Sequence, residues 1–218
     1  MIRKYLNRIY NHWRILLKDR AYSLSLFVGF IVLFGALFVN FKASVYNDLS
    51  NYPSVGDIIL NNIPAVNLDF LFDWGLVAII VAISAYGILY KPEKCPFVLK
   101  TFGILLLVRS CFILLTHIGP PVGFLVGMEQ DVNNATFFRN DLFFSGHTST
   151  PFLCYLLTRD GKYFKWFMLA SSFIMGATVL LMHVHYSIDV FSAFFITHGI
   201  YSLSDKIFNN LNVPILEQ

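Results

Sequence analysis

Two short patterns in the second half of the chain combine histidine with residues that could bind or move a phosphoryl group. The first runs from Asp141 to Thr148 and reads Asp-Leu-Phe-Phe-Ser-Gly-His-Thr, and the second runs from His183 to Asp189 and reads His-Val-His-Tyr-Ser-Ile-Asp. His185 and Asp189 are four residues apart, a spacing that stacks two side chains on one helical face. The carboxylate could accept a hydrogen bond from one ring nitrogen and leave the other free as a nucleophile.

The first pattern offers the groups that such a nucleophile needs. His147 is predicted to be the general acid that protonates a departing alkoxide. Gly146 lets the backbone approach a ligand, and Ser145 with its neighbouring amides could hold the equatorial oxygens of a phosphate. For Asp141, contact with a cationic lipid headgroup, pairing with an arginine and a role as helix N-cap all remain open.

A charged residue inside an apolar stretch adds one further candidate. Arg109 lies within the segment 97–117, and charges inside a membrane usually face a polar cavity, pair with an acid or bind substrate. Phosphate binding by a bidentate guanidinium and a structural salt bridge both remain open. His183 and His185 are two residues apart and point to nearly opposite sides of a helix, so we predict neither a metal nor another cofactor.

The composition predicts a protein embedded in a membrane. Of the 218 residues, 56% are hydrophobic and only 13% are charged, which is too apolar for a water-soluble domain of this size. We expect an all-α fold with one membrane domain over 21–218, its active-site half at about 97–205, and an amphipathic interfacial helix over 1–20. Six membrane helices are expected at about 22–41, 74–90, 97–117, 142–158, 165–183 and 187–204.

Basic residues predict the orientation, because they resist translocation across the membrane. With six crossings, all of them except Lys42, Arg109 and Arg139 fall on one side. The residues on that side are Arg3, Lys4, Arg8, Arg14, Lys18, Arg20, Lys91, Lys94, Lys100, Arg159, Lys162, Lys165 and Lys206. Both termini are therefore expected in the cytoplasm and the two histidine patterns on the extracytoplasmic side.

Other features are less specific. The first outer loop, about 42–73, could cap the site or serve as a solvated spacer, and both interpretations remain open. No basic cluster indicates a nucleic-acid partner. The three cysteines lie in an inner loop or in apolar segments, so disulfides are not expected.

The two patterns together resemble the type 2 phosphatidic acid phosphatase superfamily, and within it the sphingomyelin synthase branch. The resemblance rests on Ser145-Gly146-His147-Thr148 with Asp141 four residues before the serine, and on the run His185-Tyr-Ser-Ile-Asp-Val with His183 just upstream. It implies that His147 is the acid and that His185, supported by Asp189, is the nucleophile. A supporting place for His183 beside the site is also implied by the resemblance.

The sequence departs from the phosphatase branch at two positions. That branch has an arginine six residues before the nucleophilic histidine, where this chain has Val179, and an Arg-Pro pair where this chain has Arg109 followed by Ser110. The resemblance therefore implies transfer of a phospholipid headgroup to a lipid alcohol or water. A phosphatase acting on phosphatidic acid or an isoprenoid phosphate, and a non-catalytic lipid transporter or scaffold, are the alternatives.

Overall fold

The computed structural model describes residues 2–125, 138 and 140–209 of the chain. Over these residues the backbone forms seven α-helices and two short 3₁₀ turns, so the predicted all-α class is confirmed. The helices are α1 (Ile2–Lys18), α2 (Arg20–Asp48), α3 (Asp69–Tyr90), α4 (Cys95–Leu115), α5 (Gly146–Leu157), α6 (Phe164–Leu181) and α7 (Ser187–Asn209). The turns are η1 (Leu60–Asn62) and η2 (Pro92–Lys94). Arg139, which we expected on the outer side, lies outside the described residues.

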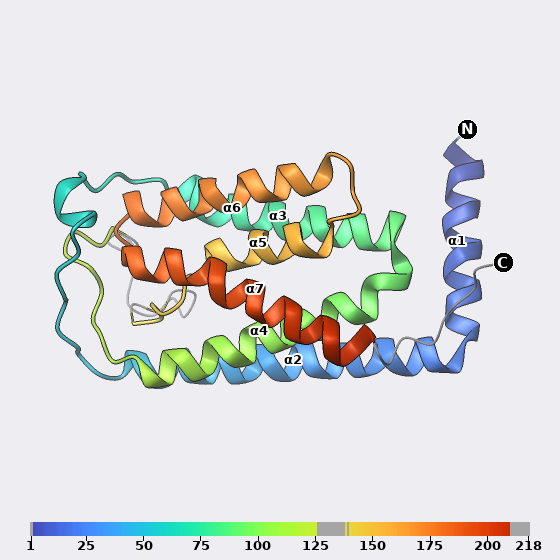
Figure 1. Cartoon of the computed structure of the whole chain (residues 1–218), viewed down its shortest axis with the longest axis horizontal. Coiled ribbons are helices and arrows are strands. Elements are labelled where there is room, and N and C mark those ends of the chain that lie inside the picture. The colour runs from blue at the N-terminus through green and yellow to red at the C-terminus, as the bar shows by residue number, and fades with distance from the viewer. Residues whose placement is uncertain (1, 126–137, 139, 210–218) are drawn as a thin grey trace.

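The helices α2 to α7 run along the long axis of the molecule, and α1 lies across one end (Figure 1). Within the bundle α2 packs on α4, α5 packs on α6 and α7, α3 contacts α6, and α4 contacts α7. The loops 49–68 and 116–125 gather at the end opposite α1. The placement of α1 at a membrane interface remains a prediction.

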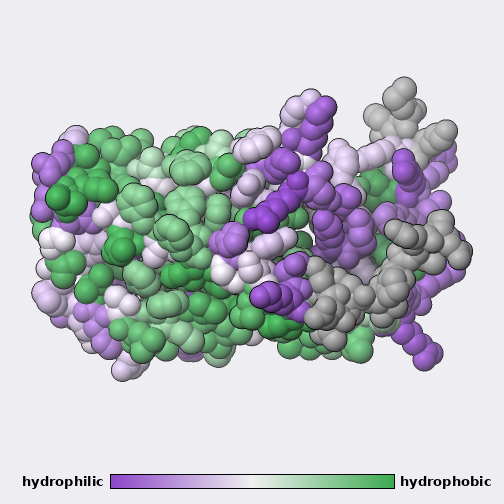
Figure 2. Space-filling model, in the orientation of Figure 1, coloured by the Kyte–Doolittle hydropathy of each residue, from purple (hydrophilic) through white to green (hydrophobic). Residues whose placement is uncertain are grey.

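Four helical segments are long and apolar enough to cross a membrane, namely α2, α3, 92–115 and α6. The protein is therefore an integral, multi-pass membrane protein. Figure 2 shows hydrophobic residues over the middle of the visible face and hydrophilic residues gathered toward the α1 end.

The other two predicted spans are not established by length and hydropathy. The 12 residues of α5 extend about 18 Å at 1.5 Å per residue, against about 30 Å of hydrocarbon. The helix α7 has 23 residues but is not among the four candidates. Six crossings therefore remain a prediction.

Small residues bring α2 and α4 close together. The buried face of α2 includes Gly29, Ala36 and Ala43, which recur every seventh residue. On α4, a Cβ added to Gly103 would lie 2.6 Å from Cγ1 of Val32. Small residues at such positions let membrane helices approach closely, and this packing fixes the face of α4 that carries Arg109.

The end of the bundle next to α1 is held by side chains that reach between segments. Asp19 caps α2 by accepting hydrogen bonds from the Ala21 and Tyr22 N–H groups. The Tyr22 hydroxyl donates to the Pro92 carbonyl at 2.6 Å, and the Trp13 indole N–H donates to the Ile88 carbonyl at 3.0 Å. These contacts hold α1 against the end of α3 and the turn η2 against α2.

Candidate active site

The first histidine pattern ends at the N-terminus of α5. The Ser145 hydroxyl oxygen caps this helix, since it accepts from the Thr148 N–H at 3.4 Å and from the Thr148 hydroxyl at 3.2 Å. The helix starts at Gly146, so the expected start at 142 is corrected, and the hypothesis that Asp141 caps this helix is wrong. His147 consequently lies in the first turn of α5.

Arg109 and Asp141 form a buried ion pair just before this helix. The distances are 2.8 Å from Nη2 to Oδ1 and 3.0 Å from Nη1 to Oδ2, and Arg109 is only 7% exposed. The Arg109 Nε–H also donates to the Phe144 carbonyl at 3.0 Å, and Nη1 donates to Asn40 Oδ1 at 3.4 Å. The pairing alternative for both residues is thus present in the structure, while substrate binding by either one remains a prediction.

These bonds explain why residues 141–145 do not continue the helix backward. The Arg109 side chain takes the Asp141 and Phe144 carbonyl groups as acceptors. A Cβ added to Gly146 would lie 3.3 Å from Arg109 Nε, so glycine permits this approach. The guanidinium charge is therefore held directly beside the Ser145–Gly146 backbone.

The His147 ring is held against an aromatic side chain that the sequence analysis missed. Phe72, near the start of α3, stacks on His147 with the ring centroids 3.9 Å apart and the planes inclined by 25°. Phe72 is only 2% exposed. No local sequence signal connects the two residues, because they come from different helices, and the contact depends on how α3 packs in the bundle.

His185 and Asp189 are paired, as their spacing predicted. His185 Nδ1 lies 3.4 Å from Asp189 Oδ2, and both side chains are almost fully buried. The helix α7 begins only at Ser187, so His185 precedes the helix and the expected shared helical face is corrected. The Tyr186 N–H donates to Asp189 Oδ2 at 2.9 Å, and this bond turns the chain so that the two side chains still meet.

A backbone hydrogen bond joins the two histidine patterns. The Ser145 N–H donates to the Asp189 carbonyl at 3.2 Å. Nearby on α6, a Cβ added to Gly176 would lie 3.1 Å from Val190 Cγ1 and 3.5 Å from Thr148 Oγ1, so α5, α6 and α7 pack closely here. The bond between Ser145 and Asp189 therefore brings the first turn of α5, which contains His147, beside the first turn of α7.

His183 has an unusual backbone and one ring nitrogen available for a ligand. Its φ is 53°, in the left-handed region that few residues other than glycine adopt. Nδ1 lies 2.7 Å from the Val122 carbonyl; a carbonyl only accepts, so Nδ1 carries the proton and Nε2 is an acceptor. His183 Nε2, His185 Nδ1 and Asp189 Oδ1 are among the buried atoms of the described residues that have no hydrogen-bond partner.

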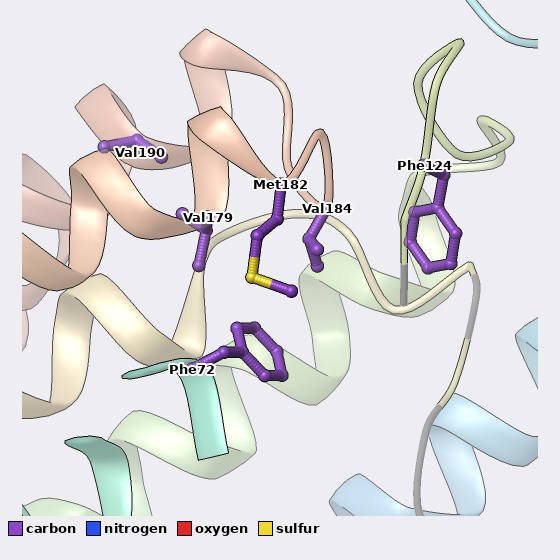
Figure 3. Close-up of a cluster of buried hydrophobic side chains, with 6 residues drawn as sticks. All are labelled: Phe72, Phe124, Val179, Met182, Val184 and Val190. Atoms are coloured by element: carbon purple, nitrogen blue, oxygen red, sulfur yellow. The ribbon is translucent and has the colours of Figure 1, made fainter. Parts of the chain in front are cut away.

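Apolar side chains line the region beside these polar groups. Phe72, which stacks on His147, belongs to a buried cluster together with Met182 and Val184, the two residues that flank His183 (Figure 3). The remaining members are Phe124, Val179 and Val190. Such surroundings have a low effective dielectric constant, which strengthens the charge interactions of the histidines and of Asp189.

Sequence comparison finds a family model and a known protein that are each similar to part of the chain. Residues 140–206, which include both histidine patterns in full, match the family model described as PAP2 superfamily C-terminal. The human protein named phosphatidylcholine:ceramide cholinephosphotransferase 2 is 32% identical over 83 residues, which are 36% of this chain and 23% of that protein. The resemblance predicted from the histidine patterns is thus confirmed: residues 140–206 of this multi-pass membrane protein match the PAP2 superfamily C-terminal model, and part of the chain is distantly similar to a human cholinephosphotransferase.

Proposed function

We propose that the protein is a lipid phosphotransfer enzyme of the membrane, which cleaves a phospholipid headgroup phosphoester and passes the headgroup to a lipid alcohol or to water. The observation that supports this most strongly is the backbone hydrogen bond from Ser145 to Asp189, which joins the segment that carries His147 to the buried His185–Asp189 pair. The family match supports lipid phosphates as the class of substrate. The human relative, named for transferring phosphocholine between two lipids, favours headgroup transfer.

In the first step His185 is the nucleophile. Asp189 faces Nδ1 at 3.4 Å, which leaves Nε2 to attack the phosphorus atom of the substrate. A P–N bond forms while the P–O bond to the leaving lipid alcohol breaks, and His147 gives its proton to the departing oxygen. Asp189 stabilises the positive charge that the phosphorylated imidazole acquires.

Charge that develops on the phosphoryl oxygens meets the N-terminus of α5. The first N–H groups of a helix have no partner within the helix and favour an anion. Arg109 places its guanidinium beside the Gly146 backbone, although all three of its nitrogens already contact acceptors in the protein. Its role in the proposal is to supply positive charge and to order residues 141–144.

In the second step an acceptor hydroxyl releases the headgroup from His185. His147, now neutral, takes the proton of the hydroxyl group, and the oxygen attacks phosphorus as the P–N bond breaks. His183 Nε2 is a neutral acceptor. Its proposed role is to accept a hydrogen bond from a hydroxyl group of a lipid. The acceptor determines the reaction class, because a lipid alcohol gives a transferase and water gives a hydrolase.

The test is turnover of a labelled phospholipid panel by the purified protein, with diacylglycerol, new headgroup lipids and free phosphate all measured. We expect His185→Ala to abolish turnover and His147→Ala to lower it by about 10²–10⁴-fold. His198→Ala is the matched control, because His198 lies exposed on the same helix as Asp189. With headgroup-labelled substrate, acid-labile label on His185 would identify the intermediate directly.

The products separate the alternatives. Diacylglycerol with a new headgroup lipid indicates a transferase, diacylglycerol with a free phosphorylated headgroup indicates a phospholipase C-type hydrolase, and phosphate released from phosphatidic acid indicates a phosphatase. Equal turnover by wild type and His185→Ala would contradict the assignment of the nucleophile. Lipid transport without turnover would favour the non-catalytic alternative.

A further inference from the structure

One carboxylate in the first outer loop is bound to the start of α7. Asp57 Oδ2 accepts from the Ser187 N–H at 2.7 Å. Its other oxygen, Oδ1, accepts from the Ile59 N–H at 2.8 Å and the Leu60 N–H at 3.1 Å. Asp57 therefore holds its own turn and the first residue of α7 at the same time.

The residue between His185 and Ser187 ties the two outer loops together. The Tyr186 hydroxyl accepts from the Val55 N–H at 3.0 Å and donates to the Gly119 carbonyl at 2.8 Å. The loops are also bonded to each other, since the Gly119 N–H donates to the Pro53 carbonyl at 3.0 Å. Three segments that are distant in sequence thus meet immediately after His185.

His185 depends on these contacts because no helix contains it. It precedes α7, and its own N–H makes only a long 3.5 Å bond to the Val179 carbonyl. Its distance from Asp189 therefore depends on the backbone of residues 186 and 187. The hydrogen bonds of the Tyr186 hydroxyl fix the first of these residues, and the bond from the Ser187 N–H to Asp57 fixes the second.

Asp57 is suited chemically to this task. Burial tends to raise its pKa, but hydrogen bonds from Ser187, Leu60 and Ile59 more than offset that tendency and hold the pKa below its usual value. The side chain is consequently a carboxylate at neutral pH. A negative charge at the N-terminus of α7 is also favoured by the helix dipole.

We propose that Asp57 is a positioning residue for His185, because it fixes the start of α7 through the Ser187 N–H. The loop 49–68 is then a working part of the site and not a solvated spacer. This inference rests on the proposed function only for the role of His185, and the contact between the loop and α7 can be tested without any substrate.

The test compares wild type with Asp57→Asn in purified protein. An asparagine has a single acceptor oxygen, so it can bond either its own turn or Ser187, but not both. We expect hydrogen–deuterium exchange of residues 185–190 to rise by about tenfold, because a hydrogen bond to a charged group is lost. We also expect diethyl pyrocarbonate to modify His185 faster, since His185 is only 3% exposed in the intact structure.

In the turnover assay we expect Asp57→Asn to lower kcat by about tenfold with KM within about twofold of wild type. Asp69→Asn is the matched control, with the same chemical change on the same side of the bundle, and should leave exchange, His185 modification and turnover unchanged. Tyr186→Phe removes the bonds to both loops and serves as a second variant should Asp57→Asn fold poorly. It should also raise exchange and His185 modification.

The outcomes separate this inference from the proposed function. If Asp57→Asn and Tyr186→Phe both show the same hydrogen exchange and the same His185 reactivity as the wild type, Asp57 does not position His185. Faster exchange with unchanged His185 reactivity and unchanged turnover would also overturn the positioning role. Should wild type turn over no lipid, the proposed function fails, and the rate of His185 modification alone decides whether Asp57 positions this residue.

Discussion

Arg109 donates hydrogen bonds to protein acceptors through all three of its guanidinium nitrogens. It therefore differs from an arginine whose donors are left free to bind a phosphate. Asp141, the Phe144 carbonyl and Asn40 take these donors. An incoming phosphate would have to displace at least one of them. The arrangement favours a role in ordering the segment before Ser145 and in supplying charge beside it.

Removing one partner of the buried Arg109–Asp141 ion pair should lower the stability of the fold. We expect Asp141→Asn to lower the free energy of unfolding by about 3–5 kcal/mol, because the buried guanidinium keeps its charge and loses its counter-charge. The double variant Arg109→Met with Asp141→Leu should be less destabilised than Asp141→Asn, since no charge then remains buried. Denaturant unfolding in detergent measures both, and a stable Asp141→Asn protein would contradict the structural importance of the pair.

At the residue scale, the sequence was informative wherever the chemistry is local. The spacing of His185 and Asp189 predicted their contact, and the paired patterns predicted that the two segments would meet, as the Ser145–Asp189 backbone bond shows. Phe72 was missed, because its contact with His147 depends on helix packing. Asp57 was only one of several aspartates in a loop, and nothing nearby indicated that its partner would be the first residue of α7.

At the scale of helices, the contact between α2 and α4 depends on the small size of Gly103. Besides the Val32 side chain, a Cβ at this position would lie 3.1 Å from both the carbonyl carbon and the carbonyl oxygen of Val32. Backbone atoms cannot move aside as easily as a side-chain terminus. The helix that carries Arg109 therefore tolerates little added volume here.

We expect Gly103→Ala to lower the free energy of unfolding by about 1–3 kcal/mol through overpacking. Gly35→Ala on α2 is the control, because nothing lies within 4 Å of the added Cβ, and it should leave stability unchanged or raise it slightly. Thermal unfolding in detergent compares the two. Equal effects at both positions would show that α2 and α4 are less closely packed than the structure indicates.

Helix boundaries followed from hydropathy only in part. The predicted segments 97–117 and 165–183 are close to α4 and α6, because apolar composition alone decides them. The segment 142–158 becomes helical only at Gly146, since Arg109 holds the Asp141 and Phe144 carbonyl groups. That tertiary contact overrides the local apolar pattern.

At the scale of the whole molecule, charge and architecture point to one orientation. The basic residues Lys91, Lys94 and Lys162 lie in the connections at the α1 end, and Lys165 lies in the first turn of α6 at the same end. The loops 49–68 and 116–125 lie at the other end (Figure 1). Basic connections are expected in the cytoplasm. We therefore predict that the candidate site opens toward the extracytoplasmic side.

Cysteine labelling in intact cells tests this orientation, using a background in which Cys95, Cys111 and Cys154 are replaced by serine. We expect a membrane-impermeant maleimide to label Asn51→Cys, at an exposed position in the loop 49–68, without permeabilisation. It should label Lys162→Cys, which is exposed in the connection between α5 and α6, only after permeabilisation. The reverse pattern would invert the predicted topology.

Composition was sufficient to predict an all-α membrane protein, because hydropathy reports directly on a lipid environment. It did not establish how many times the chain crosses the membrane, since α5 is short and α7 is not among the four candidate spans. Whether they cross depends on how the bundle sits in the bilayer, which the local sequence does not encode.

The backbone hydrogen bond between Ser145 and Asp189 has a consequence for biosynthesis. Because the ribosome makes the chain from its N-terminus, the residues through α6 are synthesised before His185 and Asp189 exist. His147 and the Arg109–Asp141 pair therefore enter the translocon or the bilayer before α7 has been made. The proposed reaction needs His185, so we expect it to begin only after α7 has been made and packed against α5.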